Sequence, residues 1–481
     1  MILSRGVHVA AFFSSAIALG LNPKSQSSVR NVAAAIAYET MTYYRGNTTD
    51  PKSREFGSVK QPYYWWVAGG LWGAMMDYYH YTTDPSYNGV LIQALLAPTN
   101  LGPGENYQPL EHSDEEGNDD LFFWGSAVLS AAERNFPQPN PDRPSWLTIS
   151  ANVFNELVGR WDTAHCGGGL FWQILPNNPN GMTYKNSISN GGFFQLSARL
   201  ARATGNKTYD EWAEKIWDWN AAVGLIDNKT YHIYDGTNIN TDCKETNKQS
   251  FSYTTGIFLY GAAIMANATG DDRWAQRTKK LLDEAAVSFF TGDKKNIMYE
   301  PACEPANNCN YDMITFKGFL SRFMWQTAQI LPSLREKVDS LMIPTAQAVA
   351  STCTGGKSGR QCGIKWYTGK FDYPYFGSQM GALEAVQGLL AQDSAVPLKG
   401  NDIKWVKDAK FKPIDTNADT GSTRPASSSK HDAGASPTTA PPTSRPSSTA
   451  KSDENGAAVV SAANDKFALL CLAILIPWLL T

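Results

Sequence analysis

The chain has 481 residues with 42 basic and 45 acidic side chains, which gives a formal net charge of −3. This near balance, without any basic cluster, argues against nucleic acid or an anionic surface as a partner. Aromatic residues are numerous, with 15 Trp, 21 Tyr and 21 Phe. Such a composition permits a cleft in which flat rings stack on sugar faces, although it does not establish one.

Residues 1–20 are typical of a secretory signal peptide. Arg5 supplies the positive charge, and residues 7–19 are apolar and small, too short for a comfortable membrane span. Small residues around Ala18 provide a cleavage site. A signal anchor is the alternative, but we expect cleavage and a secreted chain.

The body of the chain, residues 21–413, predicts one helix after another, without sustained alternation of period two. The expected helices cover residues 29–44, 71–81, 119–135, 146–161, 191–204, 209–223, 255–269, 273–290, 316–331, 333–352 and 377–390.

Two pairs of these helices repeat one pattern. Residues 191–206 and residues 256–271 each form a helix that ends in Thr-Gly, with Gly205 and Gly270 as left-handed terminators, and a second helix follows. Such repeats indicate helical hairpins. About six hairpins predict an all-α fold, the closed (α/α)6 toroid. An open helical solenoid is the alternative, but it usually shows stricter repeats. In a toroid, the N-termini of the inner helices gather around one mouth.

Six of the seven cysteines precede the C-terminal tail, an even number that suits an oxidising compartment. Two pairs close short loops, and the third pair follows by elimination. The expected disulfides are Cys166–Cys243, Cys303–Cys309 and Cys353–Cys362. No cysteine has zinc-ligand spacing, so we expect neither a metal nor a cofactor. N-glycosylation sequons occur at Asn47, Asn206, Asn228 and Asn267.

The C-terminal part has two segments of distinct composition. Residues 414–454 are rich in Ser, Thr and Pro and predict an O-glycosylated stalk. Residues 455–481 begin with small residues and end in an apolar tail, the order of a GPI-anchor signal. Asn455 is the first choice for attachment, with Ser461 or Ala462 as alternatives. A tail-anchored membrane protein is the rival interpretation. We expect a protein on the outer face of the plasma membrane or in the cell wall.

An acidic stretch, residues 115–125, leads directly into an aromatic helix. Its neighbouring Asp119 and Asp120, beside Phe123 and Trp124, suit a site where one carboxyl group is charged and the other protonated. Enzymes that cleave glycosidic bonds use one charged and one protonated carboxyl group in this way. The alternative is that Asn118 is a simple helix cap, followed by favourable first-turn acids.

Amides, cations and rings also precede or begin several other predicted helices, a mixture that suits neutral polyhydroxylated ligands. Each has a structural alternative. Gly167 to Gly169 can simply form a turn, and Asn186 and Asn190 can be turn or cap residues. Lys317 and Arg322 can form surface ion pairs. Trp172 can belong to the core, and we expect His165 beside a bridged cysteine to be structural.

Three motifs resemble glycoside hydrolase family 76, in particular its fungal GPI-anchored wall proteins. They are Asn118-Asp119-Asp120 with Phe123-Trp124-Gly125, the Gly168-to-Trp172 block, and Asn186-to-Gly192 followed by a helix. The resemblance covers about residues 30–395. It implies the (α/α)6 fold and a retaining mechanism on α-mannosides, with Asp119 as nucleophile and Asp120 as general acid/base.

Physical chemistry accommodates these roles. Neighbouring residues can hold their carboxyl groups about 5–5.5 Å apart, the separation for direct attack. A helix N-terminus favours a charged Asp119, and repulsion from that charge raises the pKa of Asp120. The candidate substrate-positioning residues are Trp124, Trp172, Asn186, Asn190, Tyr253, Lys317, Arg322 and Gln379.

The resemblance also implies a role in wall biogenesis. The expected donor is α-1,6-mannan or the mannose core of a GPI anchor, and a β-glucan of the wall is the expected acceptor. We expect a transglycosidase that acts as a monomer. The alternatives are a simple endo-hydrolase of α-1,6-mannan, an inverting glycosidase, and a non-catalytic mannan-binding wall protein.

Overall fold

A computed structural model describes residues 18–176 and 181–407, all within one compact unit formed by Met1–Ala426. The expected stalk and anchor segments, with Asn455, lie outside these residues, as does most of the expected signal peptide. Among the described helices, none has the length and apolar character needed to span a membrane.

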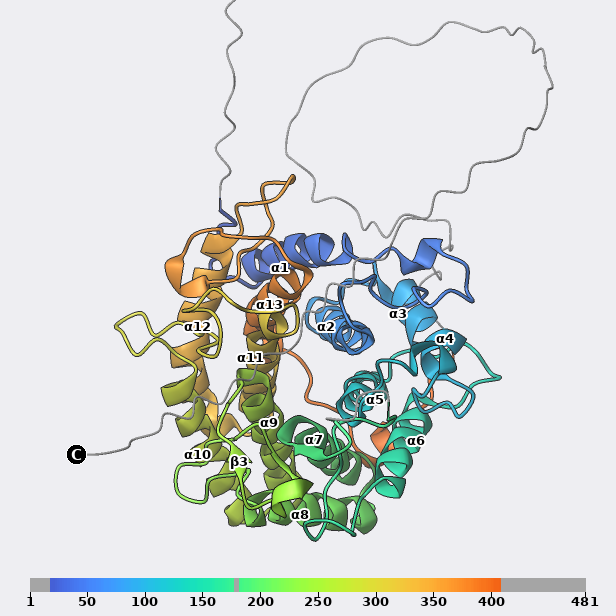
Figure 1. Cartoon of the computed structure of the whole chain (residues 1–481). Coiled ribbons are helices and arrows are strands. Elements are labelled where there is room, and N and C mark those ends of the chain that lie inside the picture. The colour runs from blue at the N-terminus through green and yellow to red at the C-terminus, as the bar shows by residue number, and fades with distance from the viewer. Residues whose placement is uncertain (1–17, 177–180, 408–481) are drawn as a thin grey trace, which may run out of the picture. The chain divides into compact units, whose positions relative to one another are not determined.

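Six helices of the described chain form an inner ring (Figure 1). They are α2 (Trp65–Thr82), α5 (Asn118–Ala132), α7 (Ser187–Thr204), α9 (Ser252–Thr269), α11 (Met313–Ile330) and α13 (Phe376–Gln387). Each packs against the next, and α13 packs back against α2, so that the ring closes. This closure confirms the predicted toroid and excludes the open solenoid.

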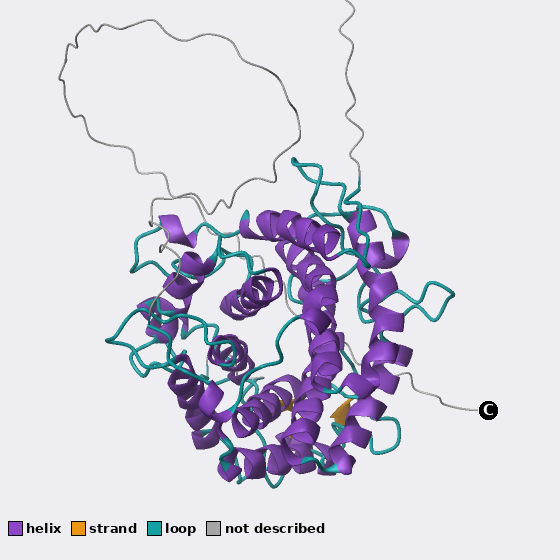
Figure 2. Cartoon of the chain, turned by 180° about the vertical axis from the view of Figure 1, so that it is seen from behind, coloured by secondary structure: helices purple, strands orange, loops and turns teal. Residues whose placement is uncertain are grey.

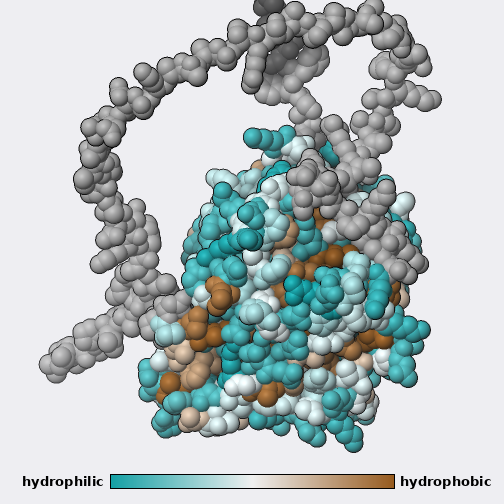
Figure 3. Space-filling model, turned by 90° about the vertical axis from the view of Figure 1, so that its right-hand side faces the viewer, coloured by the Kyte–Doolittle hydropathy of each residue, from teal (hydrophilic) through white to brown (hydrophobic). Residues whose placement is uncertain are grey.

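An outer layer covers the ring. It consists of α1 (Gln26–Met41), α3 (Asn88–Leu95) with the short α4 (Pro98–Leu101), α6 (Trp146–Gly159), α8 (Lys207–Ala222), α10 (Asp272–Ser288) and α12 (Arg335–Thr352). Outer helices are apolar on one side only: α10 buries Trp274, Thr278, Leu281, Leu282 and Ala285, at helical spacing. The outer wall seen in Figure 3 is accordingly hydrophilic for the most part, with small hydrophobic patches.

Glycines allow the inner helices to cross closely. A Cβ on Gly318 of α11 would lie 2.6 Å from the Cα of Gly381 in α13, and one on Gly191 of α7 would lie 2.5 Å from the ring of Phe258 in α9. Because real side chains do not pack at such distances, these crossings require glycine. Gly191, at the start of the helix predicted over residues 191–204, is therefore a packing residue inside α7.

The loops before α7 and α9 contribute a small antiparallel sheet that the sequence did not reveal. Strands β1 (Tyr184–Asn186), β2 (Gly236–Asn238) and β3 (Thr246–Asn247) pair in the order β1-β2-β3, with Lys185 opposite Thr237. These strands are too short to show alternation. Figure 2 shows how little strand there is among the helices.

Three disulfides join the pairs that the spacing predicted. Cys166 is bonded to Cys243, Cys303 to Cys309, and Cys353 to Cys362. The first bond links the loop before β1 to the loop between β2 and β3.

Of the four sequons, Asn206, Asn228 and Asn267 are exposed. Asn47 is wrong as a glycosylation site, because its side chain is 0% exposed in a 3-10 turn and a glycan would have no exit.

The chain after α13 crosses one end of the ring (Figures 1 and 2). The main-chain N–H of Leu398 donates to the carbonyl of Glu133 over 2.7 Å, and Arg202 donates to the carbonyl of Pro397 over 2.9 Å. Glu133 and Arg202 lie at the C-terminal ends of α5 and α7. The N-termini of the inner helices therefore form the opposite end, which we call the mouth.

Candidate active site

The first turns of four inner helices bring chemically active side chains together at the mouth. Asp119 and Asp120 begin α5, Trp66 begins α2, and Tyr253 begins α9. Asp312 stands directly before α11. The charge of Asp312 acts on Asp120, and those of Asp119 and Asp312 act on Tyr253, so these groups share one site.

Gly117 is the N-cap of α5 and orients the acidic pair. Its main-chain N–H donates to Oδ2 of Asp120 over 2.6 Å. A Cβ on Gly117 would lie 2.4 Å from Oδ1 of Asp119 and 2.8 Å from Oδ2 of Asp120. Only a residue without a side chain leaves room for both carboxyl groups. The position of Gly117 directly before Asn118 and the aspartates is the signal in the sequence that points to this role.

Burial sets the protonation of the two aspartates. It raises the pKa of Asp119 from 3.8 to about 7, against hydrogen bonds from the first main-chain amides of the helix and from Trp172. Burial, and next the negative charge of Asp119, raise the pKa of Asp120 well above 3.8. Asp119 is the member that ionises first, and Asp120 is the member that keeps its proton. Oδ2 of Asp120 accepts the Gly117 N–H, so this proton belongs on Oδ1.

Trp172 joins the catalytic helix to the small sheet. Its carbonyl accepts the main-chain N–H of Asn118 over 2.9 Å, and its own N–H donates to the carbonyl of Tyr184 over 2.8 Å. The half-buried indole hydrogen-bonds Asp119. The capping role predicted for Asn118 is wrong: Gly117 is the N-cap, and the amide of Asn118 donates to the carbonyl of Phe171.

Aromatic rings line the other side of the acidic pair. Tyr253 stacks on Phe316 with ring centroids 3.8 Å apart and planes 4° apart. Trp66 packs on Phe123 at 4.6 Å and donates from Nε1 to Oδ1 of Asp312 over 3.1 Å. Burial raises the pKa of Asp312 to about 6. Trp66 and Asp312 are site residues that the sequence did not reveal, although Asp312 follows the polar run from Asn307 to Asn310.

A second missed carboxylate belongs to the segment that enters β2. Oδ2 of Asp235 accepts the Tyr184 hydroxyl over 2.5 Å and the Asn247 amide over 3.1 Å. Burial raises the pKa of Asp235, and its charge acts on Tyr253. The small sheet thus places a further hydrogen-bonding group at the mouth.

Trp124 does not reach the mouth. It is fully buried, and its ring stacks between Trp65 at 5.1 Å and Tyr107 at 5.0 Å. The prediction of a sugar contact is wrong here, because Trp124 lies one and a half helical turns beyond Asp119 and faces the outer layer.

Three residues that were predicted to bind substrate through their side-chain amides form hydrogen bonds within the protein instead. The side chain of Asn190, 0% exposed, bonds the N–H and the carbonyl of Leu170. Gln379 likewise bonds both main-chain groups of Cys362. Asn186 caps α7 by accepting the N–H of Ser189, as its structural alternative proposed. Because these three side chains are bonded within the protein, the prediction that they bind substrate is wrong. Their role is to hold the loops in place.

Lys317 and Arg322 are buried rather than exposed to substrate or solvent. Lys317 pairs with Glu304 and donates to the carbonyl of Ile364. Arg322 pairs with Glu384, with Nε–Oε1 at 2.8 Å, and with Asp77 at 3.4 Å. Both the substrate-binding and the surface-ion-pair predictions are wrong for these residues. The charge of Arg322 lies between inner helices, and that of Lys317 lies against the loops that contain Glu304 and Ile364. Amphipathic patterns do not distinguish such buried charges from those of a cleft.

The glycine run forms a turn, in agreement with its structural alternative. Gly167, Gly168 and Gly169 all have positive φ, of 68°, 150° and 97°. His165 beside them is half exposed, and its Nδ1 lies 2.9 Å from Oδ2 of Asp162. No group of three potential metal ligands occurs in the part of the chain that the structure describes.

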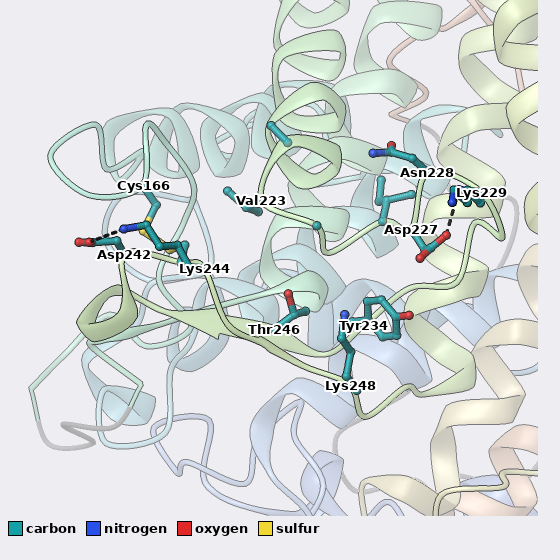
Figure 4. A pocket seen from close by; sticks show the side chains of 14 residues that line it. Cys166, Val223, Asp227, Asn228, Lys229, Tyr234, Asp242, Lys244, Thr246 and Lys248 are labelled. Carbon is teal, nitrogen blue, oxygen red and sulfur yellow. Dashed lines mark hydrogen bonds and ion pairs between the residues drawn. A yellow bond between two sulfur atoms is a disulfide. The ribbon is translucent and has the colours of Figure 1, made fainter.

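A hollow of about 740 Å³ lies away from the acidic pair. It is lined by the Cys166–Cys243 disulfide, by Tyr234 and by charged side chains of the loops around β2 and β3 (Figure 4). Neither aspartate lines it, so we assign the chemistry to the mouth despite the size of this hollow.

Comparison with known proteins places this site in a family. The sequence profile of Glycosyl hydrolase family 76 matches residues 28–401. The chain is 42% identical to Mannan endo-1,6-alpha-mannosidase DCW1 of Saccharomyces cerevisiae over 82% of this chain and 85% of that protein. It is 40% identical to Mannan endo-1,6-alpha-mannosidase DFG5 of the same yeast, over 83% and 86% of the two chains.

Solved structures agree. The crystal structure of Dfg5 from Chaetomium thermophilum in complex with glucosamine has a TM-score of 0.74 and 39% identity, covering 79% of this chain and 94% of that one. An α-1,6-mannanase of Salegentibacter shares the fold, with a TM-score of 0.59 and 18% identity over 75% and 99% of the two chains. The profile match, these relatives and the shared fold establish that the chain belongs to glycosyl hydrolase family 76.

Proposed function

We propose that this protein cleaves α-1,6-mannosidic bonds with retention of configuration, using Asp119 as nucleophile and Asp120 as general acid/base. The observation that carries the proposal is the unequal pair at the mouth. Burial and the charge of Asp119 keep Asp120 protonated, while helix amides and Trp172 favour ionisation of Asp119. A retaining glycosidase needs one charged and one protonated carboxyl group.

Similar proteins support the substrate class. The yeast relatives are named as mannan endo-1,6-alpha-mannosidases. The Salegentibacter enzyme was solved with α-1,6-mannotriose as an inactive variant in which two consecutive aspartates are replaced by asparagine. Asp119 and Asp120 of this chain are likewise consecutive.

We propose the following reaction for these groups. The Asp119 carboxylate attacks the anomeric carbon, while the Oδ1 proton of Asp120 passes to the departing glycosidic oxygen. A mannosyl ester on Asp119 results. Asp120, now charged, removes a proton from the acceptor hydroxyl, and the acceptor oxygen displaces Asp119 with a second inversion. Trp172 and Tyr253, on either side of the pair, are the residues that we propose to hold the mannose ring.

We extend the proposal to transfer. The donor would be the mannose core of a GPI anchor, or α-1,6-mannan, and the acceptor a wall β-glucan rather than water. Aromatic residues around the acidic pair support a sugar acceptor, since their faces stack on pyranose rings and displace water. The sequence features at both ends support a secreted, GPI-anchored protein with attachment at Asn455, and the role would be to link GPI-anchored proteins to wall glucan.

A trapping experiment tests the mechanism. A fluorinated mannosyl donor should leave an adduct on Asp119, located by mass spectrometry of peptides, and none in the Asp119→Asn variant. Proton NMR should show an α anomer as the first product from α-1,6-manno-oligosaccharides. A β anomer would exclude Asp119 as nucleophile and favour an inverting enzyme. Mannan binding without an adduct or turnover would favour a non-catalytic wall protein.

A second experiment identifies the acceptor. The protein is incubated with a GPI-core glycan, with and without a β-glucan oligosaccharide, and the products are identified by mass spectrometry. A mannosyl–glucan product supports transfer. Free reducing ends alone, at saturating glucan, would establish an endo-hydrolase.

A further inference from the structure

Exposed tyrosines gather at one side of the mouth. Tyr311 is 39% exposed and Tyr373 is 66% exposed, and the partly exposed Tyr375 lies between them. The ring centroids of Tyr311 and Tyr375 are 5.6 Å apart, and those of Tyr375 and Tyr373 are 6.4 Å apart. We call Tyr311, Tyr375 and Tyr373 the tyrosine rim.

The tyrosine rim is rigidly supported from below. Tyr63, which is buried, meets Tyr311 edge-on at 5.3 Å and accepts the main-chain N–H of Phe376 over 3.1 Å. The N–H of Tyr373 donates to Asp372 over 2.8 Å, and the same carboxylate also accepts the N–H of Ile364. Rings that are already fixed lose little conformational entropy when a ligand stacks on them.

The rim is continuous with the acidic pair. Tyr311 precedes Asp312, which accepts from the indole of Trp66, and Trp66 packs on Phe123 of the catalytic helix. The charge of Asp312 in turn raises the pKa of Asp120. A chain bound at the aspartates can therefore leave the mouth over Tyr311 and reach Tyr373.

Large exposed aromatic rings are rare on the described surface outside the mouth. Four aromatic residues among the described ones are large and exposed, namely Tyr64, Tyr311, Tyr373 and Trp405. The first three belong to the segments that lead into α2, α11 and α13 at the mouth. Trp405 lies at the opposite end, where its Nε1 donates to the carbonyl of Gln138. The clustering therefore points to a ligand at the mouth.

We propose that the tyrosine rim is an outlying subsite for the α-1,6-mannan chain, binding mannosyl residues beyond those that contact the aspartates. This inference rests on the proposed function for its substrate. The apolar faces of successive pyranose rings stack on Tyr311 and Tyr373, so long chains bind more tightly than short ones. The subsite favours internal bonds of a polymer over small oligosaccharides.

Binding measurements test the subsite without requiring turnover. Calorimetric titration of the Asp120→Asn variant compares α-1,6-mannotriose with a chain of eight or more mannoses. Adding Tyr373→Ala or Tyr311→Ala should reduce the affinity advantage of the long chain about fivefold, while mannotriose binding stays constant. Tyr373→Phe keeps the ring and should retain the advantage, and Trp405→Ala at the opposite end is the matched control.

Three outcomes would overturn the subsite. The long-chain advantage stays unchanged in both alanine variants, or mannotriose binding falls equally, or the variants lose binding of a β-1,3-glucan oligosaccharide but not of mannan. Turnover of mannan by the otherwise unaltered protein is measured separately. Its absence would refute the proposed function, while the binding comparison would still decide the subsite.

Discussion

The main-chain N–H of Gly117 donates to Oδ2 of Asp120 over 2.6 Å, from the residue that caps the helix on which Asp120 lies. The start of α5 and the proposed general acid are thereby held in one capping arrangement. The side chain of Asp120 satisfies an amide that would otherwise be unpaired, and the amide fixes which oxygen carries the proton.

Gly117→Ala should abolish turnover with little change in stability. The φ of Gly117 is −120°, which alanine adopts freely, but the new Cβ would meet Oδ1 of Asp119 at 2.4 Å. We expect kcat to fall at least about 100-fold, since a displaced carboxyl group misses the reacting atoms. Gly159→Ala is the control, because its Cβ would meet nothing within 4 Å. Equal activities for the two variants would contradict this role.

The pH dependence of kcat/KM should be bell-shaped, with the acidic limb near pH 7 rather than near pH 4. Turnover needs charged Asp119, whose pKa is about 7, and protonated Asp120, whose pKa is raised well above 3.8. Activity therefore rises with pH as Asp119 ionises and falls as Asp120 loses its proton. An acidic limb near pH 4 would show that the surroundings of Asp119, which is partly buried, do not raise its pKa.

Asp312→Asn should move the basic limb of this profile to lower pH. The pKa of Asp312 is about 6, so the residue is charged where Asp120 titrates, and its negative charge raises the pKa of Asp120. Removing the charge of Asp312 lowers the pKa of Asp120, so Asp120 loses its proton at a lower pH. Asp283→Asn, on an outer helix, serves as control and should leave both limbs in place. A basic limb that moves to higher pH would be incompatible with the assignment.

Arg322→Met should destabilise the protein without changing KM. The substitution leaves the buried Glu384 without its cation, and breaking a buried pair costs about 3–5 kcal/mol. Asp77 keeps its pair with Arg134. Denaturant unfolding measures the loss. Lys279→Met removes an exposed pair with Asp283 and should cost less than about 1 kcal/mol. A higher KM at unaltered stability would restore Arg322 as a substrate ligand.

Removing the Cys166–Cys243 bond should cost more stability than removing Cys303–Cys309. The first pair is separated by 77 residues and the second by 6. Loop-closure entropy then predicts about 4.5 and about 2 kcal/mol, respectively. Double Cys→Ala variants compared by denaturant unfolding give the two values. The reverse order would show that native packing around the bonds outweighs chain entropy.

The sequence was sufficient to predict the helical toroid, because two repeated hairpins and the number of predicted helices together indicate about six hairpins. It was less informative about where inner helices begin. Helix α2 starts at Trp65, six residues before the predicted start at Leu71, and α9 starts at Ser252 instead of Thr255. Inner helices are buried on every side, so they lack the polar face and the sharp polar start that mark a helix in sequence.

Only some of the site residues could be predicted from the sequence, for a similar reason. Asp119, Asp120 and Tyr253 meet at the mouth, because residues at the starts of inner helices must do so. Trp172 reaches the mouth from the loop between α6 and β1, through its main-chain hydrogen bond to Asn118. Lys317 and Arg322 fall within inner helices too, but Lys317 pairs with Glu304 of the loop before α11 and Arg322 with Glu384 of α13. The direction of a side chain around a buried helix depends on packing, which a single sequence does not encode in any visible period.

Closure of the ring has a consequence for how the chain folds. Tyr63 before α2 meets Phe376 at the start of α13 across a separation of 313 residues. At a synthesis rate of about 5–20 residues per second, roughly 15–60 s pass between the synthesis of Tyr63 and that of Phe376. The ring can therefore close only after nearly the whole domain has been made. A nascent chain shorter than this exposes an apolar helix flank, and such exposed surface favours aggregation until the ring closes.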